Sequence, residues 1–195
     1  MVRYQLCTAM LLINFSPFPN LESDRIYLRQ ITPEDVNQVF EMRSDSETMR
    51  FIPRPLAKNR QDALNHIELI TKGIMDNEYI NWGIVLKGNE KITGMICLLR
   101  MQPENYRTEI GYILHPDFQG KGIMVEAVKL VIDYAFNVLK FHSLEAVIDP
   151  DNVASEKVLL KHSFVKEGYF KENTFYNGKF LDSVIYSLIN PGKNN

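Results

Sequence analysis

The chain of 195 residues has the length of a single domain, and its hydrophobic content of 45% is enough to bury a core of ordinary size. Its 24 acidic residues outnumber its 22 Lys and Arg residues, so the positive footprint of a nucleic-acid-binding protein is missing. Two cysteines outside any CxxC pattern predict neither a disulfide framework nor a thiolate metal site, and no apolar run reaches the ~20 residues of a membrane span. We therefore expect a cytoplasmic protein that binds neither nucleic acid nor membrane.

The first twenty residues precede any clear pattern of secondary structure. Arg3 stands before an apolar stretch at residues 6–13, which faintly resembles a secretory signal, but the stretch is short and no A-x-A cleavage site follows it. An extra N-terminal strand, or a flexible lead upstream of the true start, is the alternative. We expect residues 1–20 to be an N-terminal extension, residues 21–190 to form the domain, and residues 191–195 to be a flexible tail.

The first regular patterns predict one strand and two helices. Apolar and polar residues alternate in RIYLRQ, which indicates a strand over residues 25–30. A helix over about residues 33–45 follows, with Thr32 as its N-cap and Pro33 at its first position. Apolar residues at helical spacing then predict a second amphipathic helix over about residues 63–74.

The middle of the chain changes to a period of two. Alternation over residues 79–86 and again over 92–98, on either side of the turn KGNE, predicts an antiparallel hairpin. RTEIGYILHP predicts a further strand over residues 107–116, and an apolar-rich stretch predicts a helix over about residues 123–140.

The last third completes a mixed pattern. Residues 144–150 read as a strand, Asn152 caps a helix over about residues 153–162, and two final strands meet at Asn177-Gly178. Antiparallel strands are thus followed by one strand-helix-strand unit, a helix and a closing hairpin. This order predicts a mixed α/β (α+β) fold.

The segment HPDFQGKGIMVEAV, residues 115–128, places Gly120 and Gly122 just before a predicted helix. The free N–H groups and the dipole of a helix N-terminus attract anions, and glycine lets the backbone approach a ligand such as a pyrophosphate. A Walker A loop is excluded because Lys121 is not followed by Ser or Thr, and a dinucleotide fingerprint would need glycine where Val125 stands. A tight turn without a ligand is the alternative.

Residues 119–124 resemble the signature Q/R-x-x-G-x-G/A of the GNAT N-acetyltransferases, except that Met124 stands where that family has a small residue. LESDRIYLRQITPEDV, EIGYILHPDFQGKGI and DPDNVASEKVLLKHSFVKEG, in that order, are similar to the ribosomal-protein N-acetyltransferase branch, the RimJ/RimL type. The resemblance covers about residues 21–189. It implies the GNAT fold, in which a twisted, mostly antiparallel sheet splays between two parallel strands and is flanked by helices.

The resemblance also implies a cosubstrate, acetyl-CoA, held between the two splayed strands, roughly residues 107–114 and 144–149. Backbone N–H groups of the glycine segment would hold the pyrophosphate, and the open strand edge would pair with the pantetheine amides. The implied contacts are Ile113, Leu114 and His115 at the edge, Gln119, Gly120, Lys121, Gly122, Ile123 and Met124 in the loop, and Asn152 on the pantetheine arm. Asn152 is also a sound helix N-cap.

The implied reaction is direct attack of an amine on the thioester in a ternary complex, with a peptide or protein α-amine or a small amine as acceptor. Glu109 is the candidate general base because its strand ends beside the cleft, and an ion pair on a strand face is the alternative. The resemblance assigns to Ser155 either protonation of the leaving thiolate or a contact to CoA, and a plain first-turn helix residue is the alternative. Tyr112 and Tyr169 are candidate substitutes, with core aromatic packing as their alternative. The four histidines show no metal-binding spacing, so we expect no metal ion.

A second hypothesis is a CoA-binding module of the same fold that has lost turnover, for which Met124 is the warning sign. Covalent catalysis through Cys97 is disfavoured because no histidine is near it in the sequence. The acceptor depends on the loops around residues 50–60 and 100–106 and on the hairpin at 170–182, whose shapes the sequence does not give. The partner is therefore an amine substrate of open identity, and a homodimer stays open as well.

Overall fold

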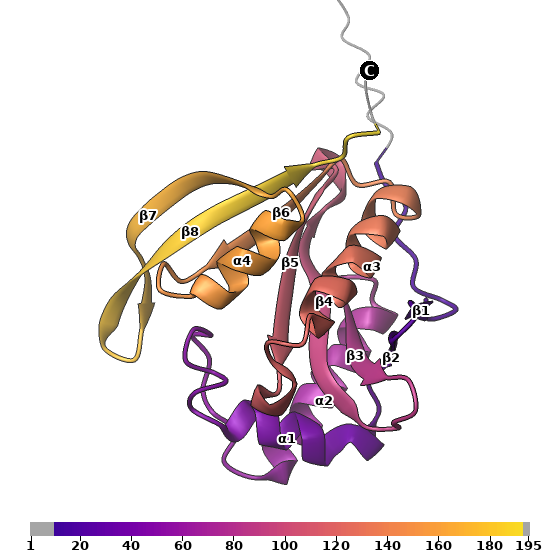
Figure 1. Ribbon diagram of the computed structural model, residues 1–195, viewed down its shortest axis with the longest axis vertical. Coiled ribbons are helices and arrows are strands. Elements are labelled where there is room, and N and C mark those ends of the chain that lie inside the picture. The colour runs from indigo at the N-terminus through magenta and orange to yellow at the C-terminus, as the bar shows by residue number, and fades with distance from the viewer. Residues whose placement is uncertain (1–9, 193–195) are drawn as a thin grey trace, which may run out of the picture.

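The computed structural model describes residues 10–192, so the start of the signal-like stretch and the last three residues of the tail lie outside the described residues. The sheet has eight strands in this range, in the order β1-β2-β3-β4-β5-β6-β8-β7 (Figure 1). They are β1 (Leu21–Glu22), β2 (Ile26–Gln30), β3 (Ile80–Leu86), β4 (Ile92–Gln102), β5 (Arg107–Leu114), β6 (Ser143–Ile148), β7 (Val165–Tyr176) and β8 (Lys179–Ile189). The α-helices are α1 (Val36–Ser44), α2 (Arg60–Met75), α3 (Ile123–Asn137) and α4 (Val153–Lys161), with 3-10 turns at Pro33–Asp35, Pro103–Asn105 and Pro116–Phe118.

The strand directions confirm the predicted fold. Neighbouring strands are antiparallel except β5 and β6, which run parallel and are connected through α3. The result is a mixed α/β fold whose mostly antiparallel sheet divides between two parallel strands. Between residues 10 and 192, no helix has the length and apolar character needed to cross a membrane.

Helices cover both faces of the sheet. On one face, the fully buried Trp82 of β3 meets the ring of Tyr134 in α3 edge-on, with ring centroids 5.6 Å apart. α2 lies on the opposite face and buries Ala63, Ile67 and Ile70, the stripe that its helical spacing predicts. α4 lies next to α3 and against β6 (Figure 1).

Residues 10–20 contain no strand or helix, but they are packed against the domain. Phe15 is 2% exposed, and its N–H donates to Oδ1 of Asn77 at 2.9 Å. Nε1 of Trp82 donates to the carbonyl of Pro19 at 2.7 Å, so the N–H of this buried indole has a hydrogen-bond acceptor. The described half of the predicted N-terminal extension therefore belongs to the folded domain, and it does not form the extra strand that was one alternative.

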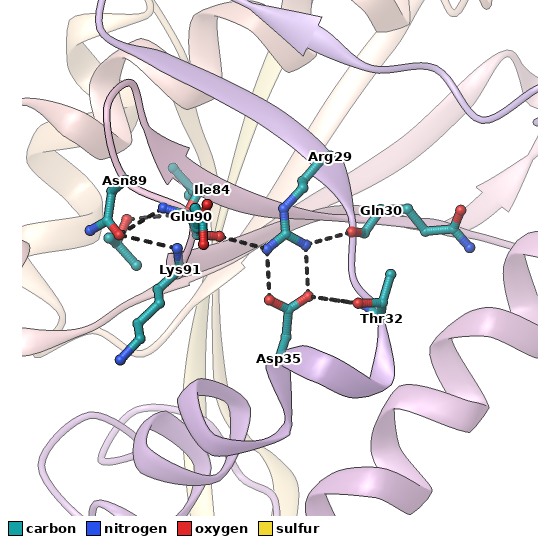
Figure 2. Close-up of polar contacts among 9 residues, drawn as sticks. Arg29, Gln30, Thr32, Asp35, Ile84, Asn89, Glu90 and Lys91 are labelled. Carbon is teal, nitrogen blue, oxygen red and sulfur yellow. Dashed lines mark hydrogen bonds and ion pairs between the residues drawn. The ribbon is translucent and has the colours of Figure 1, made fainter.

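A partly buried ion pair joins β2 to the start of the first helical segment. Figure 2 shows two guanidinium nitrogens of Arg29 on the carboxylate of Asp35, each at 2.7 Å. Asp35 is 3% exposed, and it also accepts the N–H of Thr32 at 3.0 Å. Arg29 donates further to the carbonyls of Gln30 at 2.9 Å and Glu90 at 3.0 Å, the latter in the β3–β4 turn. One side chain thus fixes three segments of the backbone.

The predicted elements are present, with shifted ends. The helix predicted over residues 33–45 is a 3-10 turn followed by α1, and α2 begins earlier than predicted because Oδ1 of Asn59 accepts the N–H of Asp62 at 3.0 Å. α3 ends at Asn137 rather than near residue 140. β4 is longer than predicted, and the short β1 was not predicted.

Candidate active site

The two parallel strands separate after three paired residues. Residues 107–109 of β5 pair with residues 143–145 of β6, whereas the rest of β6 pairs with β8 and the rest of β5 with β4. In Figure 1, the half of the sheet formed by β6, β8 and β7 diverges from β5. The predicted splay is therefore present, and beyond Glu109 one edge of β5 pairs with no strand among residues 10–192.

Backbone groups of alternate β5 residues face that open edge. His115 donates its N–H to a β4 carbonyl at 2.9 Å, and the two-residue repeat of an antiparallel ladder places the backbone groups of Ile113 on the β4 side as well. Tyr112 and Leu114 therefore face the open side, where Nε2 of Gln119 donates to the Leu114 carbonyl at 3.2 Å. Of the three residues predicted to bind along the edge, only Leu114 has its backbone there.

The glycine segment presents a row of N–H groups without acceptors. The N–H of Gln119 donates to the carbonyl of Pro116 at 3.1 Å, and the bond from the Glu126 N–H to the Gly122 carbonyl at 3.2 Å begins the helical pattern. Between these bonds, the N–H groups of residues 120–125 donate to no acceptor within residues 10–192. Such a row at the N-terminus of a 15-residue helix is suited to an anion. Of the predicted loop residues, only Gln119 does not contribute its backbone N–H.

The backbone conformation explains why Gly120 and Gly122 are glycines. Their φ angles are +72° and +76°, in the left-handed region that favours glycine. A Cβ on Gly120 would meet no atom of the described residues, 10–192, within 4 Å, so these residues leave the space beside it open to a ligand. Met124, where a small residue was expected, is 7% exposed and belongs to the hydrophobic core, so its bulk is largely packed against the protein.

Arg25, just before β2, holds the loop from outside. Its Nε donates to Glu126 in the first turn of α3 at 2.7 Å, and its Nη1 donates to the carbonyl of Lys121 at 3.2 Å. The hydroxyl of Ser23 also donates to Glu126, and Nζ of Lys121 reaches the carbonyl of Asp117 at 2.7 Å. These bonds occupy loop carbonyls and leave the row of N–H groups to a ligand.

Glu109 is the last β5 residue that pairs with β6, so it lies where the strands separate. It is 8% exposed, and its Oε2 accepts a hydrogen bond from Arg100 at 2.6 Å, which is the ion pair expected as an alternative. Arg100 reaches it from a bulge in β4 between Leu99 and Gln102, where its φ is 48°. Burial raises the pKa of Glu109, Arg100 offsets part of this rise, and Glu145 adds to it. The carboxylate is therefore ion-paired and yet disposed to accept a proton.

The first turn of α4 lies across the opening. Oδ1 of Asn152 accepts the N–H of Ser155 at 3.1 Å, so the predicted N-cap is present. The hydroxyl of Tyr112 donates to the Ser155 carbonyl at 3.3 Å, and burial raises the pKa of Tyr112 to about 12, which keeps this phenol protonated. Tyr169 instead donates to Asp182 within the β7–β8 hairpin. The structure thus brings Ser155 and Tyr112 together and leaves Tyr169 apart from them.

The remaining candidates give no second reactive centre in the described range. Burial raises the pKa of Cys97 to about 12, so its free thiol is not a nucleophile near neutral pH. No group of three or more His, Cys, Asp or Glu side chains between residues 10 and 192 could hold a metal ion.

Sequence reasoning missed Arg25 and Arg100. The partner of Arg25 on α3 is 101 positions away, and Arg100 depends on a bulge inside a strand whose apolar alternation looks regular. The only local signal near Arg100 was Pro103, which marks the following turn.

Comparison with known proteins decides the family. Residues 25–165, more than half of the chain, match the family model described as an acetyltransferase (GNAT) domain. The chain is a GNAT acetyltransferase. This GNAT enzyme is 32% identical over 174 residues to the uncharacterised N-acetyltransferase YoaA of Bacillus subtilis (strain 168), which covers 89% of this chain and 98% of YoaA.

Two further relatives carry more specific names. Spermidine N(1)-acetyltransferase of Escherichia coli (strain K12) is 25% identical over 159 residues, with 82% of this chain and 83% of that protein covered. The crystal structure of the ribosomal-protein-S5-alanine acetyltransferase from Vibrio fischeri has a TM-score of 0.76 at 25% identity and covers 89% of this chain and 98% of its own.

The GNAT enzyme is an acetyl-CoA-dependent N-acetyltransferase, an acyltransferase that transfers acetyl groups to primary amines. The residues present fit this cosubstrate, because six consecutive backbone donors, residues 120–125, suit its diphosphate and an unpaired strand edge suits its amides. Bound acetyl-CoA supplies the activated thioester.

Proposed function

We propose that the GNAT enzyme acetylates the α-amine of a peptide or protein N-terminus in the cytoplasm, as a member of the RimJ/RimL branch. An α-amine with a pKa near 7.7–8.0 is roughly 10% neutral at pH 7, whereas a lysine with a pKa near 10.4 is less than about 0.1% neutral. The likeness to the ribosomal-protein-S5-alanine acetyltransferase supports this acceptor class. A polyamine is the second candidate, which the likeness to spermidine N(1)-acetyltransferase supports.

The observation that carries the proposal is the Glu109 carboxylate at the point where β5 and β6 separate. In the proposed mechanism Glu109 takes a proton from the acceptor ammonium, directly or through water, and the neutral amine attacks the thioester carbonyl. The bond from the carbonyl carbon to sulfur then breaks, and the Ser155 hydroxyl, or alternatively that of Tyr112, protonates the leaving thiolate. The attacking nitrogen gives up its remaining extra proton, through water, to restore that hydroxyl, so the products are the neutral amide and the free thiol. No covalent acetyl-enzyme is formed in this direct transfer.

The proposed cofactor contacts follow the free hydrogen-bonding groups. The backbone N–H groups of residues 120–125 hold the diphosphate, and the open-edge groups of Tyr112 and the N–H of Leu114 pair with the pantetheine arm, since the Leu114 carbonyl already accepts from Gln119. Asn152 contributes through its Nδ2 amide, because its Oδ1 already caps α4. Ile113 and His115 contribute through their side chains at the mouth of the cleft.

The test is an acceptor screen read by mass spectrometry. The acceptors are N-terminal peptides, the same peptides with a blocked α-amine and a free lysine, and spermidine. Each acceptor is incubated with acetyl-CoA and one of three proteins: the wild type, Glu109→Gln, or Glu68→Gln. Glu68 is a control at an exposed position on α2. We expect acetylation of free α-amines, a loss of about 10²–10⁴ in rate for Glu109→Gln, and no change for Glu68→Gln. Modification of spermidine alone would select the second candidate. Calorimetric binding of acetyl-CoA without transfer to any amine would contradict the proposal and support a binding module.

A further inference from the structure

The segment between α1 and α2, residues 45–59, forms a cavity at its base. The cavity has a volume of about 340 Å³, which is within the range of small-ligand pockets. Its walls are Arg43, Pro55, Leu56, Ala57, Lys58 and Asp62.

This segment lies near the end of β5. Figure 1 shows it beside β5, below the β7–β8 hairpin and on the side where the sheet opens. Hydrogen bonds from Thr48 lower the pKa of Asp45 at the start of the segment, and His115, just after β5, contributes in the same direction. The segment whose base forms the cavity therefore lies on the side of the molecule where the sheet opens.

Arg43, in the last turn of α1, is a partly buried cation without a counter-charge. It makes no ion pair and no side-chain hydrogen bond within residues 10–192. Burial lowers the pKa of Arg43, and Arg54 lowers it further, while no carboxylate acts in the opposite direction. Partial burial of a charge without a partner costs free energy, and a bound anion would offset that cost.

The other charged groups around the cavity leave it positive. Lys58 adds a second cation to the wall, and the N-terminus of α2 begins beside it. Asp62 is the one acid in the lining, and its carboxylate is already engaged by the N–H of Lys58 at 2.7 Å. Burial lowers the pKa of His66 to about 4, with Arg43 and Arg54 adding to the effect, so its imidazole is neutral at pH 7.

We propose that this cavity is an oxyanion site, for a carboxylate or phosphate, and that in catalysis it holds a carboxylate of the acceptor peptide. Acceptors with an acidic side chain close to the α-amine are then preferred, and polyamines are repelled. The site follows from Arg43 and the cavity alone, whereas the source of the anion rests on the proposed function.

The first experiment tests the site without any turnover. The thermal midpoint is measured in sodium phosphate and in sodium chloride of equal ionic strength for the wild type, Arg43→Gln, Lys58→Gln and Arg50→Gln. Arg50 is the matched control, since it is an exposed cation of the same segment that stacks on Phe51 and does not line the cavity. A ligand that binds only the folded state raises the midpoint.

Phosphate can also bind the free N–H groups of residues 120–125, which are the same in all four proteins. We therefore expect phosphate to raise the midpoint most for the wild type and Arg50→Gln, less for Lys58→Gln, and least for Arg43→Gln. In chloride, Arg43→Gln should be at least as stable as the wild type, because an unpaired charge is removed. An equal rise of the thermal midpoint in phosphate for all four proteins would overturn the site. A large loss of stability in Arg43→Gln, combined with a rise in phosphate for Lys58→Gln as large as that of the wild type, would overturn it as well.

The second experiment identifies the source of the anion. Peptides with a neutral sequence, or with one Asp or Glu at position 2, 3 or 4, are compared by kcat/KM. For the wild type and Arg50→Gln we expect the best acidic peptide to exceed the neutral one by about tenfold or more, through KM, and Arg43→Gln to abolish this preference.

The other outcomes distinguish failure of the anion site from failure of the proposed α-amine function. Equal use of acidic and neutral peptides, together with stabilisation by phosphate, would overturn the acceptor carboxylate and assign the site to a free anion. Failure to acetylate any peptide would end the proposed α-amine function, and the phosphate measurements would still decide the cavity.

Discussion

The hydroxyl of Tyr112 on β5 donates to the carbonyl of Ser155 in the first turn of α4 at 3.3 Å. Tyr112 lies beyond Glu109, the last β5 residue that pairs with β6, so this bond crosses the opening of the sheet. It links the Tyr112 phenol, which burial keeps protonated, to the backbone of the helical turn that carries Ser155.

Ser155→Ala and Tyr112→Phe distinguish the two proton donors. If Ser155 protonates the thiolate, Ser155→Ala lowers kcat by about 10²-fold or more, since general acid catalysis contributes that much. Tyr112→Phe then loses one positioning hydrogen bond and lowers kcat by no more than about tenfold. Single-turnover thiol release measures both. The reverse order of effects would assign the proton donor to Tyr112.

Removing Arg100 should move the pH profile. Glu109 must be ionised to act as a base, so kcat/KM falls as the pH falls through its pKa, which burial places above the ordinary value for Glu. Arg100 lowers that pKa, and its side chain is 61% exposed, so we expect Arg100→Gln to shift the acidic limb upward by roughly half to one pH unit. Arg60→Gln, which removes an exposed cation on α2, should leave the limb in place. If the acidic limb of the kcat/KM profile does not move in Arg100→Gln, Glu109 is not the group whose titration produces that limb.

Arg25→Gln should weaken acetyl-CoA binding without slowing the chemistry. The substitution removes the bonds to Glu126 and to the Lys121 carbonyl that hold the loop. Since Arg25 is 55% exposed, we expect KM for acetyl-CoA to rise about three- to tenfold at unchanged kcat. Initial-rate kinetics measure this effect. Lys87→Gln, which breaks an exposed ion pair to Glu22, is the control. A fall in kcat at unchanged KM would show that Arg25 does not act through the loop.

Asp35→Asn should destabilise the fold and leave the active site intact. The exchange weakens the partly buried pair with Arg29, and loss of hydrogen bonds to a charged group costs about 1.5–3 kcal/mol. Urea unfolding gives the free energy of unfolding, with Asp24→Asn as an exposed control. An unchanged free energy of unfolding for Asp35→Asn would mean that the pair contributes no net stability.

Local patterns predicted which elements exist, and long-range contacts decided where several of them end. Apolar spacing continues past Asn137, so the sequence favoured a longer α3, but Lys140 has a φ of 64° in the turn that follows. A glycine usually marks such a position, and its absence hid the end of the helix. Residues 10–20 looked like an extension because they are held to the domain by long-range contacts, such as the hydrogen bond from Trp82 to the Pro19 carbonyl, which no local pattern shows.

In the candidate site, too, the sequence predicted the features that are local and missed those that depend on tertiary contacts. Glu109 and the glycine segment were found because a strand end and a strand-to-helix loop are local features. The direction of each backbone group along β5 depends on its register with β4, which a sequence does not give, so Ile113 and His115 were assigned to the open edge with Leu114. Arg25 and Arg100 depend on tertiary contacts in the same way.

Amide hydrogen exchange resolved by residue tests the central claim most directly. With saturating acetyl-CoA, the account predicts that exchange slows at residues 120–125, whose N–H groups pass from water to the diphosphate, and changes little at Gln119, whose N–H is already bonded to Pro116. Tight binding of acetyl-CoA that leaves exchange at residues 120–125 unchanged would contradict it.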